Sequence, residues 1–253
     1  MIVNKDKDPV FYSIEKKFKK KQDIEALKLL SKRFKINGIK YQKLLRNKKV
    51  LDVGCGTWRY TKALHKLGAT DITGVDNGPR PANLSKKIKY IDGGIFNINS
   101  KLKFDFIFCN GRLSHVKKWK LAIKKLNANL KPGGFMWLSL FAKGKHWNYV
   151  DKIRKKMTKQ DSYNFEKSLI YRDWEVNKVF FLIDLFFTDV RIYFTKNQIK
   201  KELMKQGFKN INFLKRGVEK DLNEKVYQEP KLRKIYGDGE IRLIAEKKND
   251  SNI

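Results

Sequence analysis

The sequence has few of the features that cross-link a chain or anchor it in a membrane. Its 253 residues include two cysteines, Cys55 and Cys109, which excludes a disulfide scaffold and fits a reducing compartment. No apolar run reaches the ~18 residues of a membrane-spanning helix, and the longest, Phe180 to Phe187, is interrupted by Asp184. The N-terminus has no apolar stretch after its charges, so we expect no signal peptide and a cytoplasmic protein.

Two common kinds of site are also missing. The three histidines, His65, His115 and His146, form no Cys/His cluster at metal-ligand spacing, so we expect no metal. No GxxxxGK[ST] loop occurs, which disfavours a nucleoside triphosphate as ligand. His65 falls on a predicted core helix and is interpreted as ordinary packing or surface.

Acidic residues are few: 26 Asp and Glu stand against 58 Lys and Arg, giving a formal net charge of +32. Of the basic residues 47 are Lys and 11 are Arg, whereas proteins that read nucleic-acid bases favour the bidentate guanidinium. Two interpretations stay open. A polyanion such as nucleic acid binds the basic surface, or the lysines form a solvated surface that reflects genome composition.

The apolar content, 41% hydrophobic with 13% aromatic, is enough for a packed core and too high for disorder. Residues 1–46 are predicted to form a basic helical cap. Asp8-Pro9 would begin it, and the run Lys16 to Lys21 is its most basic part. Its apolar residues recur at helical spacing: Phe11, Ile14, Phe18, Ile24, Leu27 and Phe34.

From Lys48 onwards short apolar runs alternate with helical stretches, which is typical of βαβ units and a mostly parallel sheet. We predict strands at 49–53, 71–75, 88–91, 104–109, 134–140, 211–215 and 240–246. We predict helices at 58–67, 117–129 and 196–206. Lys131 to Gly134 is predicted to be a sharp turn, and Gly207 a helix C-cap.

Residues 142–190 fit no simple βα unit and are rich in aromatic and basic residues. An insertion after the carboxyl end of a strand lies where open α/β sheets bind ligands. It is either a substrate lid or a helical layer that only packs. The predicted organisation is a cap at 1–46, a core at 47–141 and 191–248, and the lid insertion at 142–190.

The sharpest motif is a strand that runs into a glycine-rich loop and a helix start, Val50 to Thr61. Gly54 and Gly56 allow a tight turn close to a ligand, and the helix N-terminus supplies free N–H groups. Arg59 stands where a dinucleotide fingerprint needs Gly or Ala, which disfavours NAD. Asp76 follows the next predicted strand, where a carboxylate accepts hydrogen bonds from ribose hydroxyls.

Four motifs in order, DVGCGT, GVDN, FDFIFCNGRLSHV and LKPGGFMWLSLF, together resemble the class I S-adenosylmethionine-dependent methyltransferases. The resemblance covers about residues 46–145 and 190–247. It implies an α/β fold, a Rossmann-like seven-stranded, mostly parallel sheet with helices on both faces. It also implies S-adenosyl-L-methionine as the cofactor and methyl transfer as the activity.

The same resemblance implies a set of cofactor-binding residues. They are Asp52, Gly54, Cys55 and Gly56 around the methionine part, Asp76 at the ribose, Asn77 at the adenine, Gly94 and Ile95 near the adenine amine, and Asn110 facing the incoming nucleophile. Both cysteines also fit small buried positions at strand ends.

Three departures from the family pattern stand out. Trp58 replaces a small residue and either packs under the helix or walls the pocket. Gly94 stands where an acid is usual, so that either Asp92 or the backbone of Ile95 makes the contact. Residues 77–87 are short and proline-broken where the family has a helix.

The reaction needs alignment and exclusion of water more than acid–base chemistry. A base is needed only when the acceptor must lose a proton, and histidine can supply it near neutral pH. His115, just after the fourth predicted strand, is the best-placed catalytic residue, although a structural role is also open. His146 and Tyr149 are weaker candidates.

The fourth predicted strand ends in CNGRL and lacks the Asn/Asp-Pro-Pro-aromatic motif of methyltransferases that act on nucleic-acid bases. It resembles the broad group that methylates small molecules, sugars and lipids. Our first hypothesis is therefore a small-molecule, sugar or lipid-precursor acceptor. Two alternatives remain, an RNA (tRNA) methyltransferase and a degenerate scaffold or regulatory protein. The sequence leaves the oligomeric state open.

Overall fold

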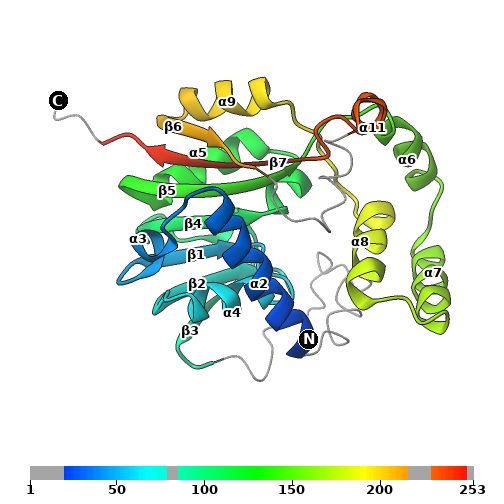
Figure 1. Ribbon diagram of the computed structural model, residues 1–253, viewed down its shortest axis with the longest axis horizontal. Helices are drawn as coiled ribbons and strands as arrows, with labels where there is room; N and C mark the ends of the chain where they lie inside the picture. Colours follow the sequence, from blue (N-terminus) through cyan, green and yellow to red (C-terminus); the bar gives the residue numbers. More distant parts are fainter. Residues whose placement is uncertain (1–19, 79–84, 216–228, 250–253) are drawn as a thin grey trace.

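The computed structural model describes residues 20–78, 85–215 and 229–249 (Figure 1). The expected features at Asp8-Pro9, at Phe11 to Phe18 and across 79–84 lie outside these ranges. The elements are α2 (Lys20–Ile36), α3 (Tyr41–Leu45), β1 (Lys49–Val53), α4 (Arg59–Lys66), β2 (Asp71–Asp76), β3 (Ile88–Asp92), η1 (Ile95–Asn97), β4 (Phe104–Asn110), η2 (Arg112–His115), α5 (Trp119–Asn129), β5 (Leu130–Phe141), α6 (Trp147–Arg154), α7 (Lys159–Tyr171), α8 (Val176–Phe187), α9 (Lys196–Lys205), β6 (Phe208–Phe213), α11 (Pro230–Tyr236) and β7 (Glu240–Lys247).

The strands form one seven-stranded sheet in the order β3-β2-β1-β4-β5-β7-β6. The pairs from β3 to β5 are all parallel, and in β1 Val50 lies opposite Ile72 and Phe106. β7 runs antiparallel to both β5 and β6. The predicted Rossmann-like α/β fold with a mostly parallel sheet is confirmed.

Helices cover both faces of the sheet, each with its own apolar cluster. Side chains of α2, α3 and α4 pack on one face with the large core ring of Trp137, which meets Phe34 edge-on at a centroid distance of 5.6 Å. Side chains of α5 and α9 pack on the opposite face. The described part of the predicted N-terminal cap, α2 and α3, therefore belongs to the helical layer that packs on one face of the sheet.

Helices α6, α7 and α8 stand beyond one end of the strands, on the right of Figure 1. They have a small apolar cluster of their own, built around Leu169, Val179 and Ile183. Within the described ranges no helix combines the length and the apolar composition needed to cross a bilayer.

Two predicted boundaries are wrong. Lys131 to Gly134 does not stand apart as a turn, because β5 begins at Leu130, which pairs with Phe104. The backbone does bend there: Gly133 has a φ of 70° and the β4–β5 register shifts between Phe104 and Phe106. The sixth strand begins at Phe208 rather than at 211, directly after the turn at Gly207.

Candidate active site

The glycine-rich loop joins the carboxyl end of β1 to α4. Gly54 and Gly56 have φ angles of 72° and 47°, a region that glycine adopts without the clash a Cβ causes. The N–H groups of Gly54 and Cys55 donate to the carbonyl of Val75 at 2.8 and 3.3 Å. The loop is therefore held against the end of β2, as the glycine pattern predicts.

Asp76 ends β2 with its carboxylate turned toward this loop. Its Oδ2 accepts a hydrogen bond from the N–H of Gly56 at 3.0 Å, and its Oδ1 accepts one from the N–H of Gly78 at 2.8 Å. Asp76 is buried, and each carboxylate oxygen has more than one lone pair. This carboxylate is fixed in place and can still accept hydroxyl donors.

Asp52 lies on β1 beside the loop and is buried. The hydroxyl of Thr61, on α4, donates to its Oδ2 at 2.6 Å. Burial raises the pKa of Asp52 to about 7, the Thr61 hydrogen bond opposes this shift, and the negative charge of Asp76 adds to it. Near neutral pH the carboxyl is therefore divided between its two protonation states, and a cation placed beside it would favour loss of the proton.

Trp58 packs in the core, so the first of the two interpretations of this residue is the one observed. Its indole is fully buried and lies against Tyr90 at a centroid distance of 5.3 Å. The residue adopts a left-handed backbone conformation with a φ of 62° just before α4. The buried indole of Trp58 therefore fixes the glycine-rich loop to the apolar core.

The loop after β3 contains the Gly93-Gly94 pair and leads into η1. The N–H of Gly94 donates to Oδ1 of Asn97 at 2.9 Å, and the N–H of Asn97 donates to the carbonyl of Gly94 at 3.0 Å. Asn97 therefore supplies a polar side chain close to the position where the family acid is missing. Asn97 was not among the predicted site residues, although its place three residues after a glycine cap is a usable signal in the sequence.

A cavity of about 590 Å³ opens between the start of η1 and the segment after β4. Its lining includes Asn77, Asp92, Gly94, Ile95, Arg112 and His115. Four of the predicted site residues, Asn77, Gly94, Ile95 and His115, therefore share one space.

Arg112 is a cavity residue that the sequence analysis did not single out. A Cβ on Gly54 would lie 2.5 Å from Cβ and 2.9 Å from Cδ of Arg112, and one on Gly94 would lie 4.0 Å from its Nη2. The Arg112 side chain therefore extends from the glycine loop toward the η1 loop. Its place between Asn110 and His115 was the available signal.

Asn110 ends β4, where the sequence analysis placed it. Its Oδ1 is buried and, among the described residues, lacks the hydrogen-bond partner that buried polar atoms usually have. Its neighbour Cys109 is buried, and burial raises the pKa of that thiol to about 12. Cys109 is therefore a packing residue and not a thiolate nucleophile, and Cys55 is also buried.

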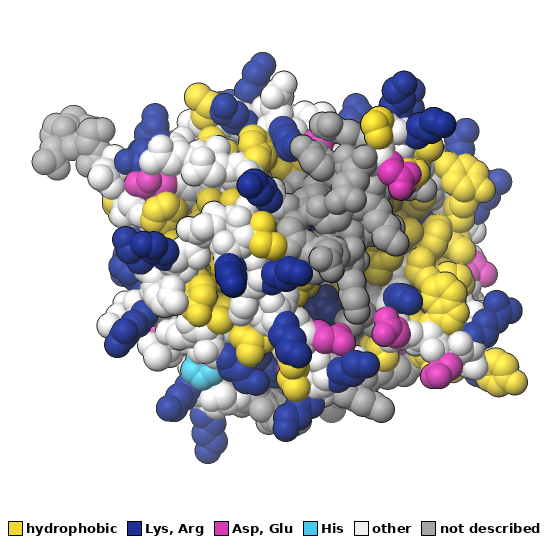
Figure 2. Space-filling view, viewed as in Figure 1, with side chains coloured by type: hydrophobic (Ala, Val, Ile, Leu, Met, Phe, Trp, Pro, Cys, Tyr) yellow, Lys and Arg dark blue, Asp and Glu magenta, His cyan; other side chains and the backbone are white. Residues whose placement is uncertain are grey.

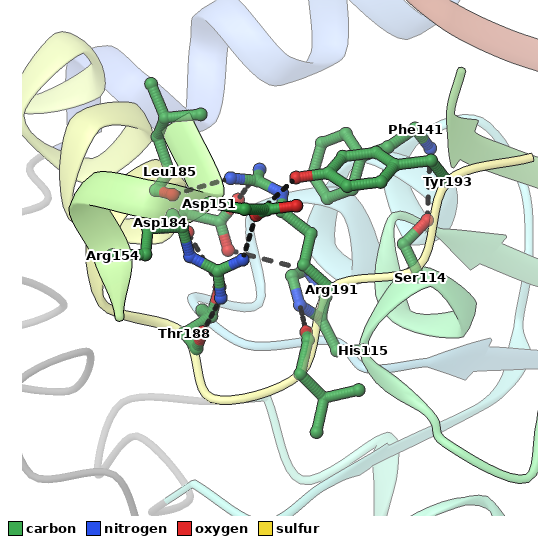
Figure 3. Close-up of polar contacts among 11 residues, drawn as sticks. Ser114, His115, Phe141, Asp151, Arg154, Asp184, Leu185, Thr188, Arg191 and Tyr193 are labelled. Atoms are coloured by element: carbon green, nitrogen blue, oxygen red, sulfur yellow. Dashed lines mark hydrogen bonds and ion pairs between the residues drawn. The ribbon is translucent and has the colours of Figure 1, made fainter. Parts of the chain in front are cut away.

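His115 lies at the end of η2 and faces α8. Its Nδ1 is 2.9 Å from the carbonyl oxygen of Val190, and its Nε2 is 3.4 Å from Oδ1 of Asp184 on α8 (Figure 3). Burial lowers the pKa of His115, against the opposing effects of Asp184 and the Val190 carbonyl. The imidazole is therefore mainly neutral at neutral pH.

The contact continues through charged side chains of α6, of α8 and of the segment after α8, of which Asp151 is partly exposed (Figure 3). Arg191 donates to Oδ2 of Asp184 at 3.1 Å, and its guanidinium lies 4.0 Å from the ring centroid of Phe141. Asp151, on α6, binds Arg154 at 2.9 Å and accepts a hydrogen bond from Tyr193 at 3.0 Å. A second contact with α8 forms at the start of α4, where the guanidinium of Arg59 lies 5.6 Å from the ring of Phe180.

Two of the weaker candidates lie apart from this cavity. His146 precedes α6, where its ring contacts Trp147 at a centroid distance of 3.9 Å, and Tyr149 is 70% exposed. His65 lies on α4 with Nδ1 2.8 Å from the carbonyl oxygen of Ala69. No group of three or more His, Cys, Asp or Glu side chains in the described ranges could hold a metal ion.

The strand order, the glycine loop and the carboxylate after β2 together define a methyltransferase fold. Residues 25–212 match the family described as "Methyltransferase domain". The chain belongs to this family, and the resemblance to class I S-adenosylmethionine-dependent methyltransferases is confirmed.

Individual relatives agree with this assignment. The chain is 31% identical to the ubiquinone biosynthesis O-methyltransferase of Vibrio parahaemolyticus over 51% of its length and 56% of the relative. It is 32% identical to the malonyl-[acyl-carrier protein] O-methyltransferase of Calditerrivibrio nitroreducens over 36% of its length and 38% of the relative. The chain thus spans about half, or less, of the length of the curated relatives it matches.

A solved structure shows the same fold. The 1,6-didemethyltoxoflavin-N1-methyltransferase of Burkholderia thailandensis, with bound 1,6-didemethyltoxoflavin and S-adenosylhomocysteine, superposes with a TM-score of 0.51. The two chains are 16% identical, and the match covers 85% of this chain and 77% of the other.

Proposed function

We propose that this protein transfers a methyl group from S-adenosyl-L-methionine to a small-molecule, sugar or lipid-precursor acceptor. The observation that carries the proposal is the buried carboxylate of Asp76, which the N–H groups of Gly56 and Gly78 fix at the end of β2. A carboxylate in this position of a Rossmann-like sheet accepts the hydroxyl groups of a ribose. Family membership and the cavity that begins beside it support the same cofactor.

The donor and acceptor groups of the site fit this cofactor. Asp76 can accept hydroxyl donors, the buried Oδ1 of Asn110 is open to an ammonium or amide donor, and Asp52 favours a cation beside it. Asn77 and the N-terminal end of η1 line the cavity that we assign to the adenine. When bound, the cofactor supplies a methyl group already activated by a sulfonium, so the residues of this chain need only bind, orient and exclude water.

The acceptor assignment rests on the fourth strand and on the relatives. β4 ends at Asn110, which Gly111 and Arg112 follow in place of the proline motif of base methyltransferases. The names of the relatives refer to ubiquinone biosynthesis, to a malonyl group on a carrier protein and to 1,6-didemethyltoxoflavin. These names favour a small acceptor, free or attached to a carrier.

An RNA acceptor is the second candidate, because of the charge. No acidic residue occurs between Asp105 and Asp151, and Lys117 and Lys118 line the cavity. Figure 2 nevertheless shows Lys and Arg side chains spread around the visible face rather than gathered in one patch. Binding of RNA through several phosphates should weaken steeply with salt, whereas transfer to a neutral metabolite should not.

A degenerate scaffold is the third alternative. It is less favoured because the ring of Trp58 packs into the core and because Asn97 supplies a polar group beside Gly94.

The experiment is transfer of a labelled methyl group to a cell extract that has been separated into small-molecule, lipid, RNA and protein fractions. The proposal expects label in the small-molecule or lipid fraction, or on a carrier-bound metabolite. Asp76→Asn should abolish it at a cofactor concentration that saturates the wild type. Label confined to RNA and removed by ribonuclease would assign the second candidate instead.

A further inference from the structure

Asp184 is the one charged residue in the apolar stretch Phe180 to Phe187. A carboxylate in such a stretch is costly to bury unless it is paired. The structure supplies two cationic or proton-bearing partners, one on each oxygen: Nε2 of His115 at 3.4 Å from Oδ1, and the guanidinium of Arg191 at 3.1 Å from Oδ2. The lid helix α8 therefore contributes a carboxylate to the cavity residue His115.

Arg191 fixes the position of that carboxylate. Its side chain is fully buried, its second guanidinium nitrogen donates to the carbonyl of Leu185 at 2.8 Å, and its plane lies over the ring of Phe141. A guanidinium remains protonated under all ordinary conditions. Arg191 therefore holds the Asp184 carboxylate in place on one oxygen, while the other oxygen faces Nε2 of His115.

The hydrogen bonds also fix the tautomer of His115. The carbonyl of Val190 can only accept, so the Nδ1 that lies 2.9 Å from it carries the proton. Nε2 is then the nitrogen with the free lone pair, and it is the one that faces Asp184. A proton taken up by His115 goes to Nε2 and is at once paired with a carboxylate.

We propose that Asp184 is a positioning residue of the active site, which the lid supplies in order to orient His115 and to stabilise a proton on its Nε2. This inference rests on the proposed function, in which the acceptor loses that proton. As the oxygen or nitrogen of the acceptor bonds to the methyl carbon, the sulfur–carbon bond breaks with its electron pair leaving to sulfur, and the acceptor proton passes to Nε2.

Other charges around His115 act against this effect. Asp184, on α8, is the carboxylate that faces the ring, while Arg191 in the segment after α8 and Arg112 on η2 are the cations. Burial and both cations favour neutral imidazole, and Asp184 and the Val190 carbonyl favour imidazolium. Burial and the two arginines thus keep the imidazole of His115 mainly neutral before the reaction. After the imidazole has taken up a proton, Asp184 and the Val190 carbonyl offset part of the free-energy cost of its positive charge.

The test is a ¹⁵N and ¹³C NMR titration of the imidazoles in the full chain, without cofactor or acceptor. The chain has only three histidines. The imidazole signals that disappear in His115→Gln are those of His115. In Asp184→Asn the titration midpoint of His115 should move about one pH unit lower, while His65 stays in place. Asp189→Asn is the matched control, because it removes an exposed lid carboxylate and should leave His115 unchanged.

An unchanged His115 midpoint in Asp184→Asn would overturn the proposal. If that variant does not fold, the wild type and Asp184→Glu still decide. The wild type must show the proton on Nδ1 of neutral His115, and the glutamate must hold the midpoint close to the wild-type value. The Nε2–H tautomer in the wild type would contradict the inference.

The pH profile of methyl transfer separates this inference from the proposed function. The acid limb of kcat should move to lower pH in Asp184→Asn by the same interval as the NMR midpoint. A shift in NMR without methyl transfer in the wild type would leave the positioning role standing and refute only the proposed function. If the wild type transfers methyl groups and the acid limb of kcat does not move in Asp184→Asn, the positioning role alone is refuted.

Discussion

The indole of Trp58 occupies the space that a side chain at position 74 would need. A Cβ built on Gly74 would lie 2.5 Å from Cζ3 and 2.8 Å from Cη2 of this ring. Gly74 is in β2 opposite Asp52, and Trp58 is the last residue before α4. Glycine in the second strand and tryptophan in the loop are thus a matched pair that sets how closely the loop approaches the sheet.

We therefore expect Gly74→Ala to destabilise the protein by about 1–3 kcal/mol, because overpacking forces a buried ring off its position. Urea unfolding followed by tryptophan fluorescence measures this. Trp58→Phe removes the two ring atoms in closest conflict. The double variant Trp58→Phe/Gly74→Ala should therefore lose less than the sum of the single losses, and strict additivity would show that the two residues are not coupled.

Asp52 predicts a pH dependence of stability. Its pKa is about 7 in the folded protein, against 3.8 as its ordinary value. The folded state therefore keeps a proton that the unfolded state releases, and this group lowers stability as pH rises from about 4 to 7. The limit for one group is about 1.4 kcal/mol per pH unit.

Asp52→Asn should remove this component, because the amide oxygen still accepts the hydrogen bond from Thr61. Unfolding free energies measured from pH 5 to pH 8 should show the variant gaining on the wild type up to about pH 7, with the gain levelling off above that pH. A constant difference across that range would mean that Asp52 is ionised throughout.

The buried Arg191 predicts a large loss of stability on removal of its charge. Arg191→Met leaves the carboxylate of Asp184 buried without its guanidinium, and we expect a loss of about 3 kcal/mol in the free energy of unfolding. Lys178→Met is the matched control, since Lys178 lies on α8, the helix of Asp184, with 67% of its side chain exposed. The control should change stability by less than about 0.5 kcal/mol, and equal losses in both variants would contradict this account.

Gly94 offers a change that separates binding from folding. A Cβ there would meet its nearest neighbours, Oδ1 of Asn77 and Nη2 of Arg112, at 3.6 and 4.0 Å, and its φ of −100° suits any residue. Gly94→Ala should therefore unfold with the wild-type midpoint but bind S-adenosyl-L-methionine several-fold more weakly, because the methyl group enters the cavity. Thermal unfolding and calorimetry on the same sample decide this, and unchanged affinity would place the adenine elsewhere.

The strands and the glycine loop could be predicted from the sequence because their signals are local. Asp52, Gly54, Gly56 and Asp76 sit in short motifs whose spacing implies the turn and the strand ends. The β5 start was misjudged because Pro132-Gly133-Gly134 is turn chemistry on any local reading. Only pairing with β4 holds those residues in the sheet.

The contact between α8 and the core could not be predicted in the same way. Asp184 and His115 are far apart in the sequence, and no local pattern joins them. The available signal was physical: a single carboxylate in an apolar helix requires a partner. Arg191, Asp151 and Arg154 carry no motif either, and only the tertiary packing brings them together (Figure 3).

Isothermal titration of the purified protein with S-adenosyl-L-methionine, with NAD as the control ligand, tests the central claim most directly. We predict binding in the micromolar range, no heat with NAD, and loss of binding in Asp76→Asn, whose fold is checked by its unfolding midpoint. A folded wild-type protein that binds no S-adenosyl-L-methionine, or an Asp76→Asn variant that binds it as tightly as the wild type, would contradict the assignment of this site.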